Sequence, residues 1–434
     1  MSFSPDGQYI AYDLYPNESS RQRDIYTLSV DWKQEVPLVR HQANDLLLGW
    51  APKGSKILLA SDRSGTLDAW AIRVSNGRPE GTPERVLRDI GPNIVPLGLD
   101  RNGSYYFGVT DQRTELYTAR LDPGTNRLLG PATKIGSVGI ETFTDWSPDG
   151  QFLASISHSG IALWDLYSWV LVIRSTATGE ERRFPLKMTK LLGFYLNWSA
   201  SGDWLLAQGR DHKGRGGFYR IDARTGEIAP FVQSENLCPP ECLDWPSELP
   251  DGKVLFIRWT SNGQSIVVLD RNTQIETKLY SVDSSRHVAD LIASPNGQQI
   301  AFVWRDVEQG TAILKLMPVT GGEPTEQLRL EQPESISGLT WTPDGRYLLF
   351  GKAISTGRGE RVVLWRIPTA GGEPEKLGLL AQGLRVYSLS LHPDGLTLAF
   401  TAGKPARREL WVIENALAPL KAENRADEES RRSK

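Results

Sequence analysis

The amino-acid sequence predicts an all-β protein, and two observations carry this prediction. A turn that reads Ser-Pro-Asp-Gly in its fullest form recurs nine times, and an apolar stretch follows each turn. No amphipathic helical pattern longer than about three turns separates the copies. The glycines of the turns follow one another roughly every 50 residues, a period at which short strands build propeller blades and not helical solenoids. They are Gly7, Gly54, Gly103, Gly150, Gly202, Gly252, Gly297, Gly345 and Gly395.

Each residue of the turn has a physical role, which is clearest in the copy SGLTWTPDGRYLLFGK at 337–352. Pro343 presets the φ angle of the second turn position, and the short side chain of Asp344 can bond the local backbone. Gly345 then takes a positive φ that other residues resist. Trp341 stands before the turn, where a large apolar side chain ends one strand and can pack between blades. The stretch YLLFGK after the turn has the composition of a second strand.

Two further strands complete each repeat. The stretch VVLWRIP at 362–368 illustrates the third strand, which leads through a tight turn at Gly371 into a more polar fourth strand. Four antiparallel strands of this kind make one blade. The sequence therefore predicts a β-propeller of four-stranded antiparallel blades.

The number of blades follows from the two ends of the repeat series. The first copy lacks its inner strand and the last lacks its outer strand, so the strand count falls between those of eight and nine complete blades. Propellers pair strands from opposite chain ends to remove exposed edges. We expect one propeller of about eight blades, with a range of seven to nine, over residues 1–415, and a charged, disordered tail at 416–434. The alternative is a seven-bladed ring from Gly103 to Gly395, with the first two copies belonging to a second propeller.

The repeats resemble the TolB-like, WD40-like family of propeller repeats, whose mark is the Ser-Pro-Asp-Gly turn followed by an apolar strand. The resemblance covers residues 3–415. It differs from the ordinary WD repeat, because regular Gly-His and Trp-Asp signatures are absent and LWDL at 163–166 stands alone. The resemblance implies a propeller that is commonly periplasmic or attached to a bacterial regulator, transporter or peptidase. It implies no single activity, because one fold hosts many functions.

Composition and charge argue against several classes of partner. A net charge of −3, with 23% charged and 39% hydrophobic residues, gives no reason to expect nucleic acid. No apolar stretch is long enough to cross a membrane, and the N-terminus lacks the layout of a secretory signal. The chain begins inside a copy of the turn motif, as a truncated gene or an excised domain would. The cellular location stays open, with an extracytoplasmic one implied by the resemblance alone.

No motif for catalysis, a metal or a cofactor stands out, and we expect none of the three. A peptidase of the prolyl oligopeptidase kind would need a Gly-x-Ser-x-Gly elbow, which the sequence lacks. The five histidines are scattered, and only His41 and His287 fall where a fourth strand passes to the next inner strand. Cys238 and Cys242 form CPPEC, which misses the redox spacing and supplies too few ligands for zinc. We expect a local disulfide between them in an exported protein, and free thiols otherwise.

Two surfaces remain as candidate binding sites. The loops between second and third strands mix arginines with acidic residues, so they form a solvated rim or a protein-docking face. The loops that lead into the inner strands surround the axial funnel, where a small ligand or a peptide end would bind. Candidates on the first surface are Arg210, Arg215, Arg358 and Arg361, and candidates on the second are Asp45, Glu141, Arg286, His287, Glu334 and Arg385.

Two functions from different classes are consistent with these features. The first is a monomeric, non-catalytic scaffold that binds a protein or peptide partner, as the sensor or interaction module of a larger bacterial regulator or envelope protein. The second is a lyase or hydrolase that acts on a saccharide or peptide in the funnel. The missing elbow and the scattered histidines favour the first. A cluster of His287 with carboxylates around a closed funnel would favour the second.

Overall fold

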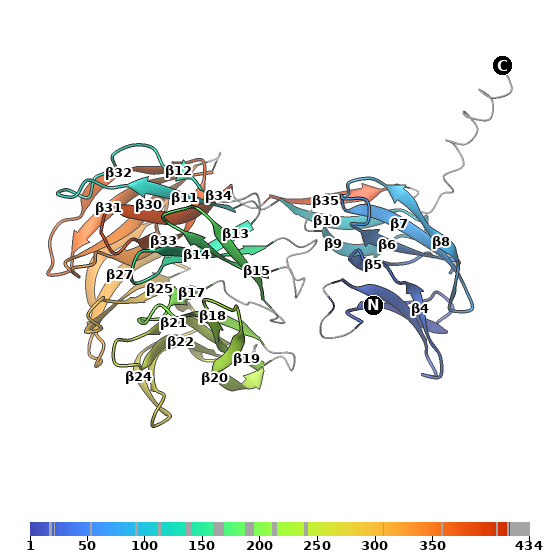
Figure 1. Cartoon of the computed structure of the whole chain (residues 1–434), viewed down its shortest axis with the longest axis horizontal. Coiled ribbons are helices and arrows are strands. Elements are labelled where there is room, and N and C mark those ends of the chain that lie inside the picture. Colours follow the sequence, from blue (N-terminus) through green and yellow to red (C-terminus); the bar gives the residue numbers. More distant parts are fainter. Residues whose placement is uncertain are drawn as a thin grey trace, which may run out of the picture. The chain divides into compact units, whose positions relative to one another are not determined.

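The computed structural model describes residues 1–16, 20, 22–52, 54–91, 94–111, 114–135, 140–158, 169–186, 195–210, 215–237, 242–306, 308–356, 359–404, 407–414 and 416. These residues form strands and turns, and none of them belongs to a helix (Figure 1). Neighbouring strands are antiparallel, except for one parallel pair of residues between Thr114 and Ile140. The predicted all-β fold with four-stranded antiparallel blades is confirmed. The expected disordered tail falls outside the described residues from 417 onward.

The described strands divide into two compact units. Unit 1 holds strands β1–β10 together with β35, and unit 2 holds β11–β34. Together they contain nine blade-like groups of strands, which agrees with the predicted range of seven to nine blades. The prediction that residues 1–415 form one domain stays a prediction.

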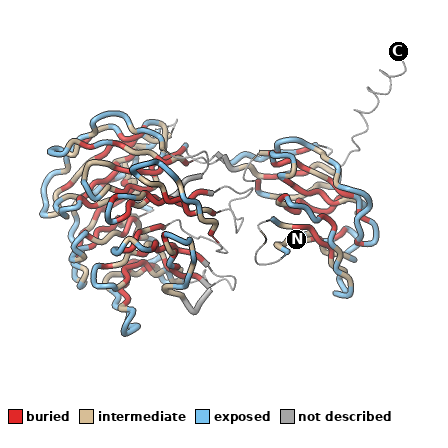
Figure 2. Tube along the Cα trace, in the orientation of Figure 1, coloured by how far each residue is buried: buried red, intermediate tan, exposed pale blue. Residues whose placement is uncertain are grey.

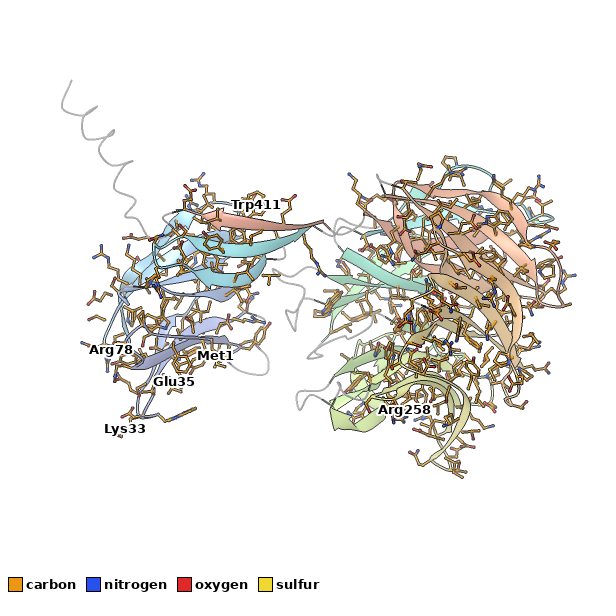
Figure 3. All side chains as sticks on the ribbon, turned by 180° about the vertical axis from the view of Figure 1, so that it is seen from behind. Met1, Lys33, Glu35, Arg78, Arg258 and Trp411 are labelled. Atoms are coloured by element: carbon orange, nitrogen blue, oxygen red, sulfur yellow. The ribbon has the colours of Figure 1, made fainter. Side chains whose placement is uncertain are left out.

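Unit 1 consists of three blade-like sheets, each with its strands in sequential order from the inner edge outward. The turn at 31–34 and the strand at 78–87 are largely polar and exposed, whereas Leu38 and Val39 of the strand at 35–39 are buried; the exposed Lys33, Glu35 and Arg78 are labelled in Figure 3. The three sheets are β1 (Ser2–Phe3), β2 (Tyr9–Leu14), β3 (Asp24–Ser29) and β4 (Glu35–Val39); β5 (Asp45–Trp50), β6 (Lys56–Ser61), β7 (Asp68–Ser75) and β8 (Arg78–Leu87); and β9 (Ile94–Leu99), β10 (Tyr105–Asp111) and β35 (Arg407–Ile413).

Unit 2 is a closed ring of six blades. The inner strands of neighbouring blades contact one another in the order β13, β17, β21, β25, β29 and β33, and β33 contacts β13 again. The blades are β13 (Ile140–Trp146), β14 (Phe152–His158), β15 (Trp169–Ser175) and β16 (Glu181–Pro185); β17 (Leu196–Trp198), β18 (Trp204–Arg210), β19 (Arg215–Asp222) and β20 (Ile228–Leu237); β21 (Cys242–Glu248), β22 (Val254–Thr260), β23 (Gly263–Asp270) and β24 (Ile275–Val282); β25 (Arg286–Ala293), β26 (Gln299–Asp306), β27 (Thr311–Pro318) and β28 (Thr325–Glu331); β29 (Glu334–Trp341), β30 (Tyr347–Thr356), β31 (Gly359–Pro368) and β32 (Glu375–Gln382); and β33 (Arg385–Leu391), β34 (Thr397–Gly403), β11 (Thr114–Arg120) and β12 (Thr133–Lys134).

The third and ninth repeats each contribute strands to both units. The third repeat gives β9 and β10 to unit 1 and β11 and β12 to unit 2, whereas the ninth gives β33 and β34 to unit 2 and β35 to unit 1. In unit 2, β11 pairs with β34 from Thr114↔Gly403 to Arg120↔Thr397. In unit 1, β10 pairs with β35 from Tyr105↔Ile413 to Asp111↔Arg407. Strands from distant parts of the chain therefore complete one blade in each unit, which covers edges that would otherwise stay unpaired.

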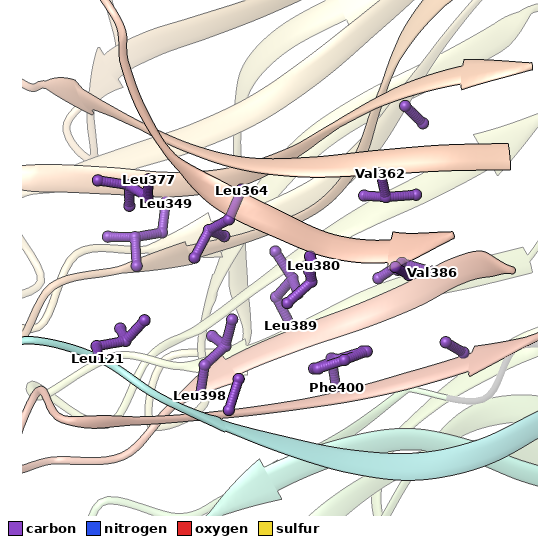
Figure 4. Packing of buried hydrophobic residues seen from close by; sticks show 14 residues of the cluster. Leu121, Leu349, Val362, Leu364, Leu377, Leu380, Val386, Leu389, Leu398 and Phe400 are labelled. Atoms are coloured by element: carbon purple, nitrogen blue, oxygen red, sulfur yellow. The ribbon is translucent and has the colours of Figure 1, made fainter. Parts of the chain in front are cut away.

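The hydrophobic core lies between the faces of neighbouring blades. Buried residues run along the strands, and exposed residues gather at the turns (Figure 2). Figure 4 shows one such interface in unit 2, where Leu398 and Phe400 of β34 pack near Leu349 and Leu364 of the preceding blade, all four at most 1% exposed. Each side chain of this size stabilises the fold by about 1.5–3 kcal/mol when it is fully buried.

The recurrent turn is held by the side chains that the sequence pattern singles out. In the copy at 147–152, Ser147 Oγ donates to Asp149 Oδ1 at 2.6 Å and accepts from the backbone N–H of Phe152 at 2.9 Å. Gly150, at a φ of 70°, donates its N–H to the Ser147 carbonyl at 2.8 Å. His392 replaces the serine in the last copy, where its Nδ1 accepts from the N–H of Asp394 at 3.1 Å. The predicted local hydrogen bonding of the turn and the predicted positive φ of its glycine are therefore confirmed.

Candidate binding site at the axis of unit 2

A cavity of about 380 Å³ lies at the centre of the six-bladed ring. Residues of all six inner strands, or directly next to them, line it. Most of them come from the carboxyl-terminal half of each inner strand, next to the recurrent turn. The residues that matter below are Phe143, Asp145, Tyr195, Asn197, Trp245, Asp290, Gly338, Thr340, Trp341, Tyr387 and Ser390.

Backbone irregularities in the inner strands place several of these residues. The pairing register shifts around Phe143 in β13, Trp245 in β21, Asp290 in β25, Gly338 in β29 and Tyr387 in β33. Such β-bulges leave a residue outside the ladder and re-aim its side chain. All five residues line the cavity.

Two of the bulges hold a non-glycine residue in the left-handed region. Trp245 has a φ of 53° and Asp290 a φ of 51°, and Gly338 occupies the same kind of position at 71°. A positive φ is uncommon for residues other than glycine and is a true outlier for a bulky one such as tryptophan. Strained backbone of this kind clusters at functional sites, and two of the seven described non-glycine residues with a positive φ, Trp245 and Asp290, line this cavity.

Three aromatic rings form one wall of the cavity. The ring centroids of Tyr195 and Trp245 lie 4.1 Å apart, and the ring of Phe143 lies 4.7 Å from Tyr195 and 5.9 Å from Trp245. They come from the β13, β17 and β21 blades. The aromatic faces of three blades therefore meet at the axis, and we call these three residues the aromatic wall.

Asp145 ties three blades together beside this wall. Its Oδ2 accepts a hydrogen bond of 2.9 Å from the N–H of Trp198, and its Oδ1 accepts one of 2.9 Å from Ser390 Oγ and one of 3.1 Å from the N–H of Trp146. Burial raises the pKa of Asp145 to about 6, and these hydrogen bonds act in the opposite direction. Both carboxylate oxygens are thus occupied by the protein.

A second carboxylate, Asp290, is 7% exposed and pairs with Arg305 at 3.2 Å. Burial raises the pKa of Asp290, and Arg305 opposes this shift. Burial also raises the pKa of Asp244 next to Trp245, and burial together with the two carboxylates Asp244 and Asp290 raises the pKa of Tyr195. The surroundings of the aromatic wall are therefore acidic.

Trp341 differs from the equivalent tryptophans of two other blades. The indole N–H of Trp146 donates to the carbonyl of Ser390 at 3.2 Å, and that of Trp198 donates to the carbonyl of Asp145 at 3.1 Å. The indole N–H of Trp341 is buried and has no hydrogen-bond partner among the described residues. A buried donor without a partner is destabilising by about 1–3 kcal/mol, and the buried indole N–H groups of Trp50, Trp70 and Trp365 likewise have no partner among the described residues.

Comparisons with known proteins establish the fold. No protein-family model matches the chain. Atu1656, an uncharacterized protein of Agrobacterium fabrum, is 23% identical over 161 residues, which make up 36% of this chain and 53%, about half, of that protein. A structure described as a TolB from Agrobacterium tumefaciens matches with a TM-score of 0.50 and 17% identity over 68% of this chain and 99% of that chain. The chain has the fold of a TolB-like β-propeller.

Two further structures resemble this TolB-like propeller. TolB from Acinetobacter baumannii matches with a TM-score of 0.43 and 14% identity, over 79% of this chain and 78% of that chain. An oligogalacturonate lyase in complex with manganese matches with a TM-score of 0.44 and 12% identity, over 93% of this chain and 99% of that chain.

The residues expected around the funnel lie at the opposite end of the inner strands from the cavity lining. Arg286 pairs with Asp306 at 3.5 Å, Glu334 with Lys352 at 2.7 Å, and Arg385 with Glu360 at 3.8 Å. None of these residues lines the cavity of the TolB-like propeller. Their binding role stays a prediction.

His287 and Asp45, two further funnel candidates, are not among the residues that line the cavity. His287 is half-buried, and burial and then Arg305 lower its pKa. Asp45 lies in unit 1, where it is fully buried and pairs with Arg63 at 2.7 Å. The backbone of Glu141 in β13 pairs with that of Ser157 in β14, and the side chain of Glu141 lies outside the described ones.

The candidates on the arginine-rich loops are described only in part. Arg361 is exposed on β31, where its backbone pairs with Ile354. Arg210 ends β18 and Arg215 begins β19, but their side chains, like Arg358 as a whole, lie outside what the structure describes. Cys242 is disulfide-bonded, and Cys238 lies outside the described residues.

Sequence reasoning missed the cavity lining, although a signal was present. Phe143, Tyr195, Trp245, Asp290 and Gly338 each stand seven residues before the glycine of the recurrent turn. The shared spacing places them at equivalent points of five inner strands. Their mixed residue types hide the pattern, because no single residue type recurs there.

None of the described segments is a helix long and apolar enough to cross a bilayer. Within the described part of the chain, no group of three or more His, Cys, Asp and Glu side chains is placed to hold a metal ion.

Proposed function

We propose that this chain is a binding module that holds a peptide segment of a protein partner in the axial cavity of unit 2. The aromatic wall carries this proposal, because Phe143, Tyr195 and Trp245 bring apolar faces from three blades to one point. Small-ligand sites are concave and largely apolar, with a few placed polar groups, and begin at about 300 Å³. A cavity of about 380 Å³ therefore suits a side chain or a peptide end and not a folded domain.

The state of the carboxylates supports binding over catalysis. A general acid or base must reach the proton that it transfers. Both oxygens of Asp145 accept hydrogen bonds from the protein, and Asp290 is held by Arg305. The lining, as far as the structure describes it, contains no histidine, lysine or cysteine. A role as the interaction module of a larger bacterial regulator or envelope protein fits such a site.

Panning a displayed peptide library against three forms of the full chain tests this proposal. The first form is wild type, and the second carries Thr340→Phe, which places a larger side chain at a lining position. The third carries Arg361→Glu on the arginine-rich loop face, away from the lining. Near-ultraviolet circular dichroism checks that each variant is folded before binding is measured.

Peptides that bind wild type and Arg361→Glu but not Thr340→Phe support the axial site. Loss of binding in Arg361→Glu alone would move the site to the arginine-rich loops. Mass spectrometry of the selected peptides after incubation examines the enzyme alternative, since cleavage would contradict a purely binding role. Failure of every peptide to bind wild type would also contradict the proposal.

A further inference from the structure

We infer that the axial cavity recognises a cationic side chain, lysine or arginine, of the bound peptide. This inference rests on the proposed function and specifies the chemistry of its ligand. Two independent features of the cavity point to it: the aromatic wall and the charge of the lining.

The aromatic wall lacks the protein cations that other aromatic rings of this chain carry. Arg63 lies over the ring of Trp70 with its Cζ 4.9 Å from the centroid, and Lys352 lies 5.4 Å from the ring of Trp365. Among the described residues, no such contact involves Phe143, Tyr195 or Trp245. Aromatic faces attract cations within about 6 Å through their quadrupole, so the wall can receive a cation from a ligand.

The charge of the lining has the sign that a cation needs. Among the described residues of the lining, Asp145 and Asp290 are the charged ones, and no lysine or arginine joins them there. Arg305 neutralises Asp290 in part from β26. Among the described side chains, no cation pairs with Asp145, whose charge is balanced by hydrogen bonds alone. An anionic ligand would meet like charge at this site.

Matched tripeptides test the inference without changing the protein. Acetyl-Gly-Arg-Gly-amide and the same peptide with citrulline have nearly the same shape, and only the first is charged. Lysine and norleucine form a second pair, and a glutamate peptide is the anionic control. Affinities for the full chain come from calorimetry, with saturation-transfer NMR for weak binders.

We expect the arginine and lysine peptides to bind at least about tenfold more tightly than citrulline and norleucine, as a desolvated cation–π contact together with a carboxylate would produce. Equal binding within a pair, or tighter binding of the glutamate peptide, would overturn the inference. If library peptides bind wild type but not Thr340→Phe, and no charged tripeptide is preferred, the inference of cation recognition is wrong and the proposed function stands. If neither library peptides nor tripeptides bind, both fail.

Two variants test whether Trp245 and Asp290 produce the preference for the charged peptides. Trp245→Leu removes one aromatic face but keeps an apolar side chain, and Asp290→Asn keeps a residue type that tolerates the left-handed backbone. Each should lower the affinity for the arginine peptide about threefold to tenfold while leaving the weak affinity for the citrulline peptide unchanged. An equal loss for both peptides would indicate a general structural effect and would contradict cation recognition at these residues.

Discussion

The carboxylate of Asp145 accepts a 2.9 Å hydrogen bond from Ser390 Oγ, although the two residues are 245 positions apart in the sequence. The indole N–H of Trp146 reinforces this contact by donating to the carbonyl of Ser390 at 3.2 Å. Both contacts join β13 to β33, where the first complete blade of unit 2 meets the blade completed by β11 and β12. Closure of the ring thus depends on buried polar groups at the axis as well as on strand pairing.

The Asp145→Asn variant should reveal a stability contribution that depends on pH. The folded chain holds this proton more tightly than the unfolded chain, because burial raises the pKa to about 6 from a reference of 3.8. The carboxyl therefore contributes stability that is complete below about pH 4 and is lost as the pH rises to about 6. Asparagine does not titrate in this range. We expect the stability of wild type relative to the variant to fall by about 2 kcal/mol from about pH 4 to about pH 6, and by about 3 kcal/mol over the whole titration, as measured by urea unfolding at several pH values.

A difference between wild type and Asp145→Asn that stays constant from about pH 4 to about pH 7 would contradict this assignment. Exposed carboxylates elsewhere in the chain titrate in both proteins, so their effects cancel in the comparison.

A pair of glycine substitutions should separate backbone strain from crowding. Gly338 and Gly345 have nearly the same φ, 71° and 70°. A Cβ on Gly338 would lie 2.7 Å from Leu389 Cγ, whereas a Cβ on Gly345 would meet nothing within 4 Å. Gly345→Ala should lower the free energy of unfolding by about 1–2 kcal/mol, and Gly338→Ala by about 1–3 kcal/mol more because of overpacking. Equal losses in urea unfolding would show that Leu389 yields without strain.

Removal of Arg63 should strongly destabilise unit 1. Asp45 is fully buried, pairs with Arg63 at 2.7 Å, and has one carboxylate oxygen, Oδ2, without a hydrogen-bond partner among the described residues. Arg63→Met leaves a buried charge without its partner, so we expect a loss of about 3–5 kcal/mol in the free energy of unfolding. Adding Asp45→Asn should recover part of it, because the uncompensated charge disappears. A double variant as unstable as Arg63→Met would contradict this account.

The exchange of strands between repeats predicts a selective effect of truncation. A chain that ends at Lys404 lacks β35 but keeps β34, and β35 pairs with all seven residues of β10. We expect faster amide hydrogen exchange in β10 and unchanged protection in the inner strands of unit 2. A chain that ends at Ala416 is the control and should behave as the full chain. Loss of protection throughout β33 and β34 in the shorter chain would contradict the observed assignment of strands.

The sequence predicted the blades well because each is specified locally. The turn at Gly150, for example, needs only Ser147, Asp149 and the glycine to form, and all three stand within four residues. Local sequence patterns could not predict that the third and ninth repeats share their strands between two blades. The stretches that form β11 and β35 have the same pattern, and nothing local decides whether β10 pairs with one or the other.

The candidate site was harder to predict than the fold. Residues at the starts of the inner strands were expected to surround the funnel, but Glu334 and Arg385 form ion pairs away from the cavity lining. The cavity is lined instead by bulged residues such as Trp245 and Asp290, and the left-handed backbone is contrary to the residue type of Trp245. A bulge depends on pairing across a blade, so local preferences could not indicate it.

Photo-crosslinking tests the central claim, an axial binding site in unit 2, most directly. A peptide selected by panning would carry a photoreactive group next to its binding residue, and mass spectrometry would map its crosslinks on the full chain. We predict crosslinks to lining segments of several blades, including 143–145, 195–197 and 387–391. Crosslinks confined to the segment 354–361 on the arginine-rich face, or spread evenly over both units, would contradict it.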